Sequence, residues 1–414
     1  MRDGWRRLSL ADIAETTLGR QLSPGRRLGV RPRQYLRAAN VQNGAISLKD
    51  VLLMDFTTDE ETRFALRPGD VLLVEGGNEN SVGCPAIVTD REAGLCFQNT
   101  LVRVRVRDWS ECSPQFLCLA LDMRFRDGRM AGMSTGTTIA HLGATRVPRI
   151  EIDVPPLAEQ RRIVDLIATL DHAVGAAKEA GRRIVQTRRS VLLDMAESFR
   201  SDWVPLTHAL THVIGGAWGD SAGTSDIDVD ALNLLVFSSP TSTVDPQYSS
   251  RRSLSRARLA SRSIEQDDIL LERSGGTDDQ AVGRVVRAAE ALPGVVPTDF
   301  MRLLRVDPMV AEPRYVFWWL WARYQRGDTH AFQSKTTNIR NLRVGDYLAL
   351  PIRLPSRADQ RALVALGESF TDAIEAAGSV AARLDALRGA VLTDLLSGDH
   401  EIPASYDRFL DGAA

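Results

Sequence analysis

Long apolar runs are missing from this chain of 414 residues. Nowhere does a stretch of about 18 apolar residues occur, the length that a helix needs to cross a bilayer. The first residues, 1–7 (MRDGWRR), also lack the apolar core of a secretory signal peptide. The sequence therefore predicts a soluble, cytoplasmic protein without a membrane partner.

Cysteine is scarce, and its spacing is not that of a metal site. The four cysteines contain no C-x-x-C pair, whereas a structural zinc site needs four converging ligands, usually in two close pairs. They are Cys84, Cys96, Cys112 and Cys118. We expect reduced structural thiols, since cytosolic proteins seldom keep disulfides.

The sequence signatures of an enzyme are missing as well. There is no Gly-x-x-x-x-Gly-Lys phosphate loop of an ATP-driven motor. A DNA methyltransferase would need a glycine-rich cofactor loop and an Asn-Pro-Pro-Tyr type tetrapeptide, but Pro155 and Pro156 lie in the unrelated segment DVPPL. Only three lysines occur, which leaves no carboxylate cluster with a nearby lysine. The sequence predicts a non-catalytic protein that holds neither a cofactor nor a metal.

What the chain does contain is an internal repeat. Five anchors recur in the same order at offsets of 198 to 200 residues, which indicates two copies of one module. The matched pairs are Trp5 and Leu8 with Trp203 and Leu206, 69–73 (GDVLL) with 267–271 (DDILL), 134–142 (STGTTIAHL) with 334–342 (SKTTNIRNL), 155–161 (PPLAEQR) with 355–361 (PSRADQR), and 188–194 (RRSVLLD) with 388–394 (RGAVLTD).

The front of each module, residues 1–155 and 202–355, has a mixed pattern. Short aliphatic runs at 70–74, 100–106, 268–272 and 302–306 predict strands, and 114–125 and 313–324 each predict one amphipathic helix. The second helix carries Trp318, Trp319 and Trp321, for which a core role is favoured over base stacking. Two polar segments, 215–223 and 238–250, are expected to be flexible or to contact a partner. The fold class predicted is therefore α/β (α+β), two modules in tandem.

The back of each module, residues 156–201 and 356–400, predicts a long helix, and residues 401–414 form a C-terminal tail. Apolar residues recur in alternating steps of four and three, in the same register in both copies. The seam contains Ile163, Ile167, Leu170, Val174, Ile184 and Val191, then Leu363, Phe370, Ile374, Leu384, Val391 and Leu395. We expect the helices to pair as an antiparallel intramolecular coiled coil. Two unrelated surface helices would explain the periodicity but not the matched register.

These motifs resemble those of a known family. Residues 68–77 (PGDVLLVEGG), the segment from Ser134 to Ile163 and its second copy from Ser334 look like the specificity subunits of type I restriction–modification systems. The resemblance covers essentially the whole chain and is weaker in the second module, where Arg357 and Asp359 replace the usual Leu and Glu.

The resemblance implies a division of labour. Each globular part would be a target-recognition domain that reads one half of a split site in double-stranded DNA. The long helices would serve as a spacer and as the docking surface for DNA adenine methyltransferase subunits, which carry S-adenosylmethionine. Whether a translocase–nuclease subunit joins them is left open by the sequence.

Two polar loops per module are the candidate DNA-reading elements. Asn and Gln suit adenine, Arg suits guanine, acids can accept from cytosine, and hydroxyls suit phosphates. The candidates are Asn78, Asn80, Ser81, Thr135, Thr137, Thr138 and His141 in the first module, and Arg273, Asp279, Gln280, Lys335, Thr336, Thr337, Asn338 and Arg340 in the second. Arg33 and Arg37, in a basic run near the start, are further candidates for phosphate contacts.

Composition does not decide between DNA and another partner. The 51 basic and 53 acidic residues give a formal net charge of −2, and a locally basic face is compatible with that balance. The alternative is a non-enzymatic scaffold whose two modules bind protein partners. The two differ in one measurable respect, because DNA binding weakens steeply as salt rises.

Overall fold

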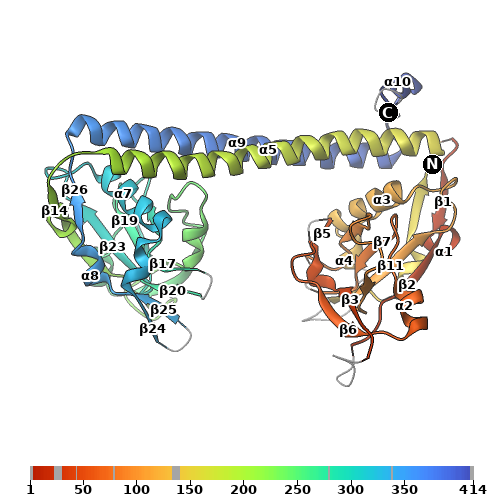
Figure 1. Cartoon of the computed structure of the whole chain (residues 1–414), viewed down its shortest axis with the longest axis horizontal. Helices are drawn as coiled ribbons and strands as arrows, with labels where there is room; N and C mark the ends of the chain where they lie inside the picture. Colours follow the sequence, from red (N-terminus) through yellow and green to blue (C-terminus); the bar gives the residue numbers. More distant parts are fainter. Residues whose placement is uncertain are drawn as a thin grey trace. The chain divides into compact units, whose positions relative to one another are not determined.

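The computed structural model describes residues 3–22, 30–42, 44–77, 80–132, 140–277, 280–336 and 339–410. It forms two compact units, one made of residues 1–175 and 382–414 and the other of residues 176–381. Each unit combines one globular module with a segment of each of two long helices, α5 (Leu157–Ser198) and α9 (Arg357–Ser397) (Figure 1). No described helix is both long and apolar enough to span a membrane.

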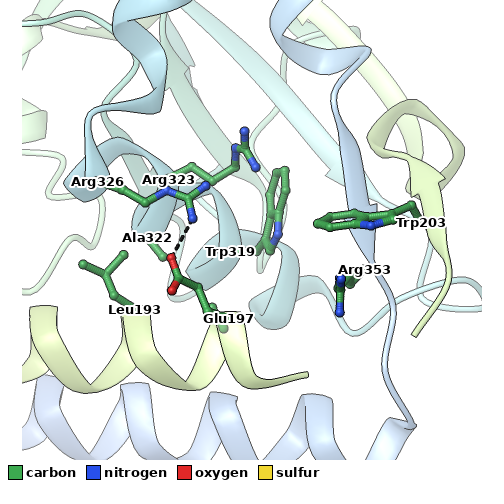
Figure 2. A pocket seen from close by; sticks show the side chains of 9 residues that line it. Leu193, Glu197, Trp203, Trp319, Ala322, Arg323, Arg326 and Arg353 are labelled. Atoms are coloured by element: carbon green, nitrogen blue, oxygen red, sulfur yellow. Dashed lines mark hydrogen bonds and ion pairs between the residues drawn. The ribbon is translucent and has the colours of Figure 1, made fainter. Parts of the chain in front are cut away.

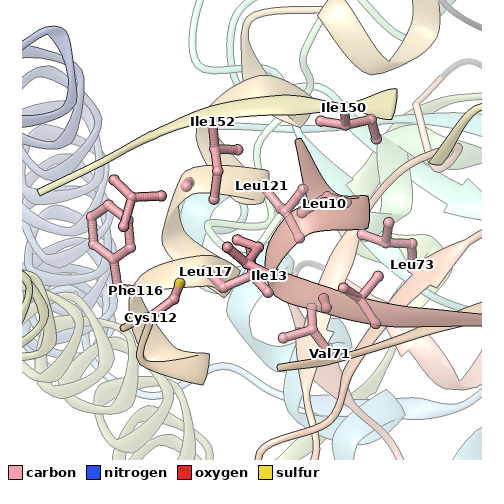
Figure 3. Packing of buried hydrophobic residues seen from close by; sticks show 14 of the residues in the cluster. Leu10, Ile13, Val71, Leu73, Cys112, Phe116, Leu117, Leu121, Ile150 and Ile152 are labelled. Carbon is pink, nitrogen blue, oxygen red and sulfur yellow. The ribbon is translucent and has the colours of Figure 1, made fainter. Parts of the chain in front are cut away.

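A four-stranded antiparallel sheet is the centre of the first unit. Its strands follow the order β2 (Ala14–Leu18), β11 (Leu101–Val106), β7 (Val71–Val74) and β9 (Pro85–Ile87). All four residues of β7 are buried, as its unbroken apolar sequence requires. Helix α3 (Pro114–Arg126) packs Phe116 and Leu117 into the same core as α1 (Leu10–Ile13) (Figure 3).

The first unit also contains smaller sheets. One has the order β10 (Cys96–Phe97), β3 (Pro32–Leu36) and β6 (Leu52–Asp55). Another pairs β1 (Arg6–Ser9) with β13 (Glu151–Val154), the strand that leads into α5. The chain therefore returns to its first strand before the long helix begins.

The second unit repeats this plan. Its central sheet has the order β15 (Leu210–Gly215), β23 (Met301–Val306), β19 (Ile269–Glu272) and β21 (Val285–Arg287), and β14 (Trp203–Pro205) pairs with β26 (Pro351–Arg353) ahead of α9. Helix α7 (Pro313–Arg326) corresponds to α3. A further sheet has the order β16 (Asp220–Ser221), β18 (Ser249–Leu254), β17 (Ile227–Leu232) and β22 (Val295–Pro297).

The two long helices pair within each unit, and the partners show the direction. In the first unit, Ile163 and Ile167 from the beginning of α5 share a core with Leu392 and Leu395 from the end of α9. In the second unit, the end of α5 and the beginning of α9 share a core. Because beginnings meet ends, the pairing is antiparallel. The predicted fold class, tandem α/β modules joined by an antiparallel coiled coil, is confirmed.

The seam follows the heptad pattern. All twelve predicted seam residues lie in the described part of the chain and are buried or half-buried. Within the second unit, a Cβ placed on Gly181 would lie 3.6 Å from the Cβ of Ala377. Small residues at this crossing let the two backbones approach closely.

Two segments differ from the sequence-based expectation, and the C-terminal tail makes contacts about which the sequence made no prediction. Ser334, Lys335 and Thr336 lie on a strand, β24 (Gln333–Thr336), rather than in a loop, because β24 pairs with β25 (Ile339–Leu342) as a hairpin. The middle of the 238–250 segment is packed, with Ser242 buried. The tail is partly docked, since Ile402 joins the first core and Asp407 accepts hydrogen bonds from Arg162 at 2.6 and 2.8 Å.

Candidate nucleic-acid interface

A buried carboxylate fixes the turn that precedes a central strand in each module. Asp70 accepts a hydrogen bond from the backbone N–H of Arg67 and two from Arg105, at 2.6 and 2.7 Å. In the second unit, Asp268 accepts from the backbone N–H of Glu265 and from Arg305, at 2.8 and 2.7 Å. The Asp at the second position of the repeated motif therefore fixes the turn before β7 and β19 and ties it to the neighbouring strand, β11 or β23.

In the first unit, a short strand pair brings the two predicted loops together. Strand β8 (Gly76–Gly77) belongs to the first loop and pairs with β12 (Ala140–His141), which belongs to the second. The Nδ1 atom of His141 lies 3.0 Å from Oε2 of Glu75, and the backbone N–H of Leu142 donates to the Glu75 carbonyl at 2.8 Å. Loops that are about 65 residues apart in sequence therefore form one polar surface.

The second unit makes the equivalent junction with different side chains. Strand β20 (Ser274–Gly276) pairs with β25, and the backbone N–H of Leu342 donates to the Arg273 carbonyl at 2.7 Å. The Ser274 hydroxyl donates to Oδ1 of Asn341 at 2.5 Å. The sheet of β20, β25 and β24 lies on the side of this unit away from the paired helices (Figure 1).

The glycine pairs allow these loops to turn back on themselves. A Cβ on Gly77 would lie 2.3 Å from Oγ of Ser81, and a Cβ on Gly276 would lie 2.5 Å from the carbonyl oxygen of Gln280. At Gly276 the obstacle is a backbone oxygen, so a side chain there would displace the loop. At Gly77 the obstacle is a serine hydroxyl, which can rotate away, so close approach of the chain requires glycine at 276 but not at 77.

The candidates described at these junctions are of mixed exposure. Asn80, Gln280 and His141 are exposed, whereas Ser81 is half-buried. Arg340 is half-buried on β25, with Nη1 3.4 Å from Oε1 of Gln333. The remaining candidates, Asn78, Thr135, Thr137, Thr138, Asp279, Thr337 and Asn338, lie outside the described residues, as do the side chains of Lys335 and Thr336. Their role in DNA binding stays a prediction.

Arg33 and Arg37 come from β3 (Pro32–Leu36) and from the residue that follows this strand. Arg33 lies on β3, and its Nε donates to Glu61 at 2.7 Å. This hydrogen bond holds the pKa of Glu61 below its ordinary value. Arg37 is bonded to Asp50. Both arginines are paired with carboxylates of their own unit, and their phosphate-binding role stays a prediction.

The tryptophans of α7 are core residues. Trp318, Trp319 and Trp321 are all buried, so stacking on bases is not their role in this structure. Trp319 and Trp203 line a small cavity of about 200 Å³, and the guanidinium of Arg353 lies 4.4 Å from the Trp203 ring centroid (Figure 2).

Sequence reasoning missed a glutamine that occurs once in each repeat. Gln160 is fully buried; its Oε1 accepts from the backbone N–H of Ser113 at 2.8 Å, and its Nε2 donates to the carbonyls of Glu111 and Pro155, both at 2.9 Å. Gln360 likewise accepts from the N–H of Glu312 and donates to Pro355. Each glutamine ties the beginning of a long helix to the beginning of α3 or α7. Its identity in both repeats, at an internal position of a matched anchor, was the available signal.

No metal centre is evident in the described part of the chain. No group of three or more His, Cys, Asp or Glu side chains is arranged there to hold a metal ion. The four cysteines are free, and burial raises the pKa of Cys96 to about 11 and that of Cys112 to about 12. At neutral pH such thiols are protonated, which suits packing rather than metal binding or nucleophilic chemistry.

Comparisons with solved structures agree with the fold. One chain, from a structure on the complex assembly and conformational transition of the type I R-M system, matches with a TM-score of 0.58 and 18% identity over 97% of this chain and 99% of that one. An S subunit of a type I restriction–modification system from M. genitalium (TM-score 0.48, 13% identity, 96% and 97% covered) and an HsdS subunit from Thermoanaerobacter tengcongensis (0.41, 18%, 97% and 98%) also match. A comparison with curated protein sequences found no match.

The family comparison identifies the first module directly. The model of the type I restriction modification DNA specificity domain matches residues 3–180, which include the whole first globular module and the beginning of α5. The resemblance inferred from the repeated motifs is therefore confirmed. Over these residues this chain is similar to the type I restriction modification DNA specificity domain.

Proposed function

We propose that this chain is the DNA-specificity subunit of a type I restriction–modification complex and that each module reads one half of a bipartite target. The observation that carries the proposal is the repeated junction of two polar loops, β8 with β12 and β20 with β25, on the same scaffold. A shared scaffold with different side chains at its tip suits two readers of different short sequences.

The two loop junctions carry different side chains, as readers of two different base sequences would. The first junction offers His141, Glu75 and Asn80, whereas the second offers Arg273, Gln280 and Arg340. Arg and Gln can make paired hydrogen bonds to guanine and adenine, and Asn can do the same to adenine. We infer that base contacts come from these loops.

The helices supply the spacing and the docking surface in this proposal. A helix of about 40 residues is roughly 60 Å long, enough to separate two half-sites by a helical turn or more of DNA. DNA adenine methyltransferase subunits, with S-adenosylmethionine bound to them, would dock along the helices and carry out the chemistry. A translocase–nuclease subunit would be an additional partner in a restriction-competent complex.

The test is to co-express the chain with its methyltransferase subunits and sequence the methylated bases of the host genome. We expect one bipartite motif with a fixed gap. Replacing residues 1–155 with those of a relative should change one half of the motif only. A change of both halves would show that the modules do not read independently.

Point variants refine the assignment. His141→Ala should relax or weaken one half of the motif, and Arg340→Ala the other, by about 1–3 kcal/mol of discrimination at the affected base. Arg7→Ala, in an exposed ion pair with Asp153 and remote from both junctions in sequence, is the control. If the complex methylates nothing and the purified chain does not bind DNA at low salt, the scaffold alternative is favoured instead.

A further inference from the structure

The second unit exposes a tryptophan close to its loop junction. Trp218 lies in the 215–223 segment and is 43% exposed. Its ring meets the ring of Phe300 edge-on, with the two centroids 5.9 Å apart. The Phe300 carbonyl in turn accepts hydrogen bonds from the backbone N–H groups of Arg273 and Ser274, at 2.7 and 3.2 Å. Because Ser274 begins β20, a single residue connects the exposed ring with the junction of β20 and β25.

The guanidinium of Arg252 lies over this ring. Arg252 is on β18, and its Cζ is 4.6 Å from the centroid of the Trp218 ring. The half-buried Arg252 side chain forms no hydrogen bond or ion pair with the residues that the structure describes. None of its nitrogens is both buried and without a partner, so all of them reach solvent. Stacking holds the guanidinium by its face, while the N–H groups in its plane stay available to a ligand.

The neighbouring strands explain why no carboxylate pairs with Arg252. Its direct cross-strand neighbours are Ser221 on β16 and Val229 on β17, and neither carries a charge. Successive side chains of a strand point to opposite faces, so the preceding residue, Arg251, lies on the other face of the sheet. There its cross-strand neighbour is Asp230, with which it forms an ion pair at 3.3 Å. One strand therefore carries a neutralised arginine and, next to it, an arginine with solvent-facing donors.

Two further arginines add positive charge beside Phe300. Neither Arg273 nor Arg302 forms an ion pair with a carboxylate in the described part of the chain. Burial lowers the pKa of Arg302, the nearby charge of Arg273 lowers it further, and Asp299 opposes the shift. Asp299 also accepts a hydrogen bond from the backbone N–H of Trp218 at 3.3 Å. The Trp218 surface, with three arginines and one aspartate, consists of Trp218, Arg252, Arg273, Asp299, Phe300 and Arg302.

The first unit has different residues at the equivalent positions. Backbone hydrogen bonds that recur in both units align them, and the Glu75 N–H donates to the Thr100 carbonyl at 2.9 Å as the counterpart of the Arg273 bond. The counterparts of Trp218, Arg273, Phe300 and Arg302 are Gln21, Glu75, Thr100 and Val102. The first unit thus has a carboxylate where the second has an arginine, and it has no aromatic ring at the matching places.

We propose that Arg252, held by the Trp218 ring, binds a phosphate of the DNA backbone beside the bases read by the junction of β20 and β25. Its solvent-facing N–H groups suit phosphate oxygens, and the charges of Arg273 and Arg302 attract the same polyanion. The proposal rests on the proposed function, because it takes DNA as the ligand. It makes the two modules unequal, since the second holds the DNA backbone through a contact that the first lacks.

The test measures the binding of a mixed-sequence DNA duplex as a function of salt. The full chain is co-expressed with its methyltransferase subunits, and the affinity of the purified protein is measured between about 50 and 200 mM salt. Arg252→Gln should weaken binding roughly tenfold at low salt and make the slope of log K against log salt shallower by about 0.9, because one phosphate contact is lost. Arg251→Gln, which removes the same charge from the opposite face of β18, should leave the slope unchanged.

Trp218→Ala tests the positioning role of the ring, because it changes no charge. It should make the slope shallower in the same way as Arg252→Gln, and Trp218→Phe, which keeps a ring under the guanidinium, should restore it. The melting temperature of each variant verifies that the second unit stays folded. An unchanged slope in a folded Trp218→Ala protein would show that the ring does not position Arg252 for DNA.

The methylated motif provides a second readout. Phosphate contacts carry no base identity, so Arg252→Gln should lower the level of methylation while the motif stays the same. If Arg252→Gln and Arg251→Gln give equal slopes, or if Arg252→Gln alters the motif, this proposal is wrong and the proposed function stands. If the wild-type protein binds no DNA at low salt, the proposed function itself fails, and the phosphate contact fails with it.

Discussion

Arg188 and Arg388 stand at matching places of the two long helices, yet their surroundings are opposite in kind. Arg388 is held by the carboxylates of Asp122 and Asp171, whereas Arg188 lies against the rings of Trp318 and Trp321. By contrast, the buried glutamine at the beginning of each long helix keeps the same role in both units. The repeat thus preserves the groups that hold the backbone in place, and it lets the charges along the helix pair diverge.

The largest difference between the units should appear when the two arginines are removed. Arg388→Met leaves Asp122 buried with only Arg126 as a partner, so we expect a loss of about 3 kcal/mol in the unfolding free energy of the first unit. Arg188→Met leaves no carboxylate without a partner, so the unfolding free energy of the second unit should change by less than about 1 kcal/mol. Urea titration with hydrogen exchange of the α3 and α7 amides reports each unit separately. Equal losses would show that the aromatic rings stabilise the charge as well as the carboxylates do.

The glutamines provide a comparison in which the units should behave alike. Gln160→Leu leaves one backbone N–H and two carbonyls without their hydrogen-bond partner. Gln360→Leu leaves one N–H and one carbonyl without theirs. Each buried group without a partner costs about 1–3 kcal/mol, so at the lower end we expect the unfolding free energy to fall by about 3 kcal/mol for the first variant and about 2 kcal/mol for the second. Exchange of the Ser113 and Glu312 amides should become faster in the matching variant. Unchanged exchange would show that the glutamines do not hold the helix beginnings.

Substitutions in the turns before β7 and β19 should change the unfolding free energy by smaller amounts. Gly69 has φ of 89° and a Cβ there would lie 2.7 Å from the Trp109 ring, so Gly69→Ala should cost about 1–2 kcal/mol. Asp267 takes the same place with φ of 65° and pairs with Arg287 and Arg314. Asp267→Gly removes the strain of a positive φ at a residue with a side chain, but it also removes the ion pairs with Arg287 and Arg314. We expect these effects to offset each other, so the unfolding free energy should change by no more than about 1 kcal/mol. Thermal unfolding of both variants is the measurement, and a larger loss in Asp267→Gly would reverse this ranking.

Much of the architecture was predictable because it depends on local patterns. The runs predicted as strands at 70–74 and 268–272 correspond to β7 and β19, and the helix predicted at 114–125 corresponds to α3. Buried strands and amphipathic helices leave a periodicity that is readable without knowledge of the neighbours. The internal repeat also predicted that the two modules would have similar structures and similar roles.

The candidate site was predictable only in part. The two loops of each module were identified separately, but their junction through β8 and β12 was not, because strands of two residues carry no periodic signal. Ser334 was assigned to a loop and lies on β24, since a short polar strand looks like a turn in sequence. The contacts of Arg188 could not be anticipated either, because an arginine on a helix is usually solvated.

By itself, the sequence determined that this protein has two equivalent modules, a matched helical seam and loops rich in hydrogen-bonding side chains. These properties follow from spacing along the chain, which the sequence records directly. Only the tertiary structure decided which loops meet, which carboxylates neutralise Arg388 and that Arg188 has no carboxylate partner among the residues that the structure describes. Those outcomes depend on groups far apart in the chain, and they are fixed by packing of the whole unit rather than by any local preference.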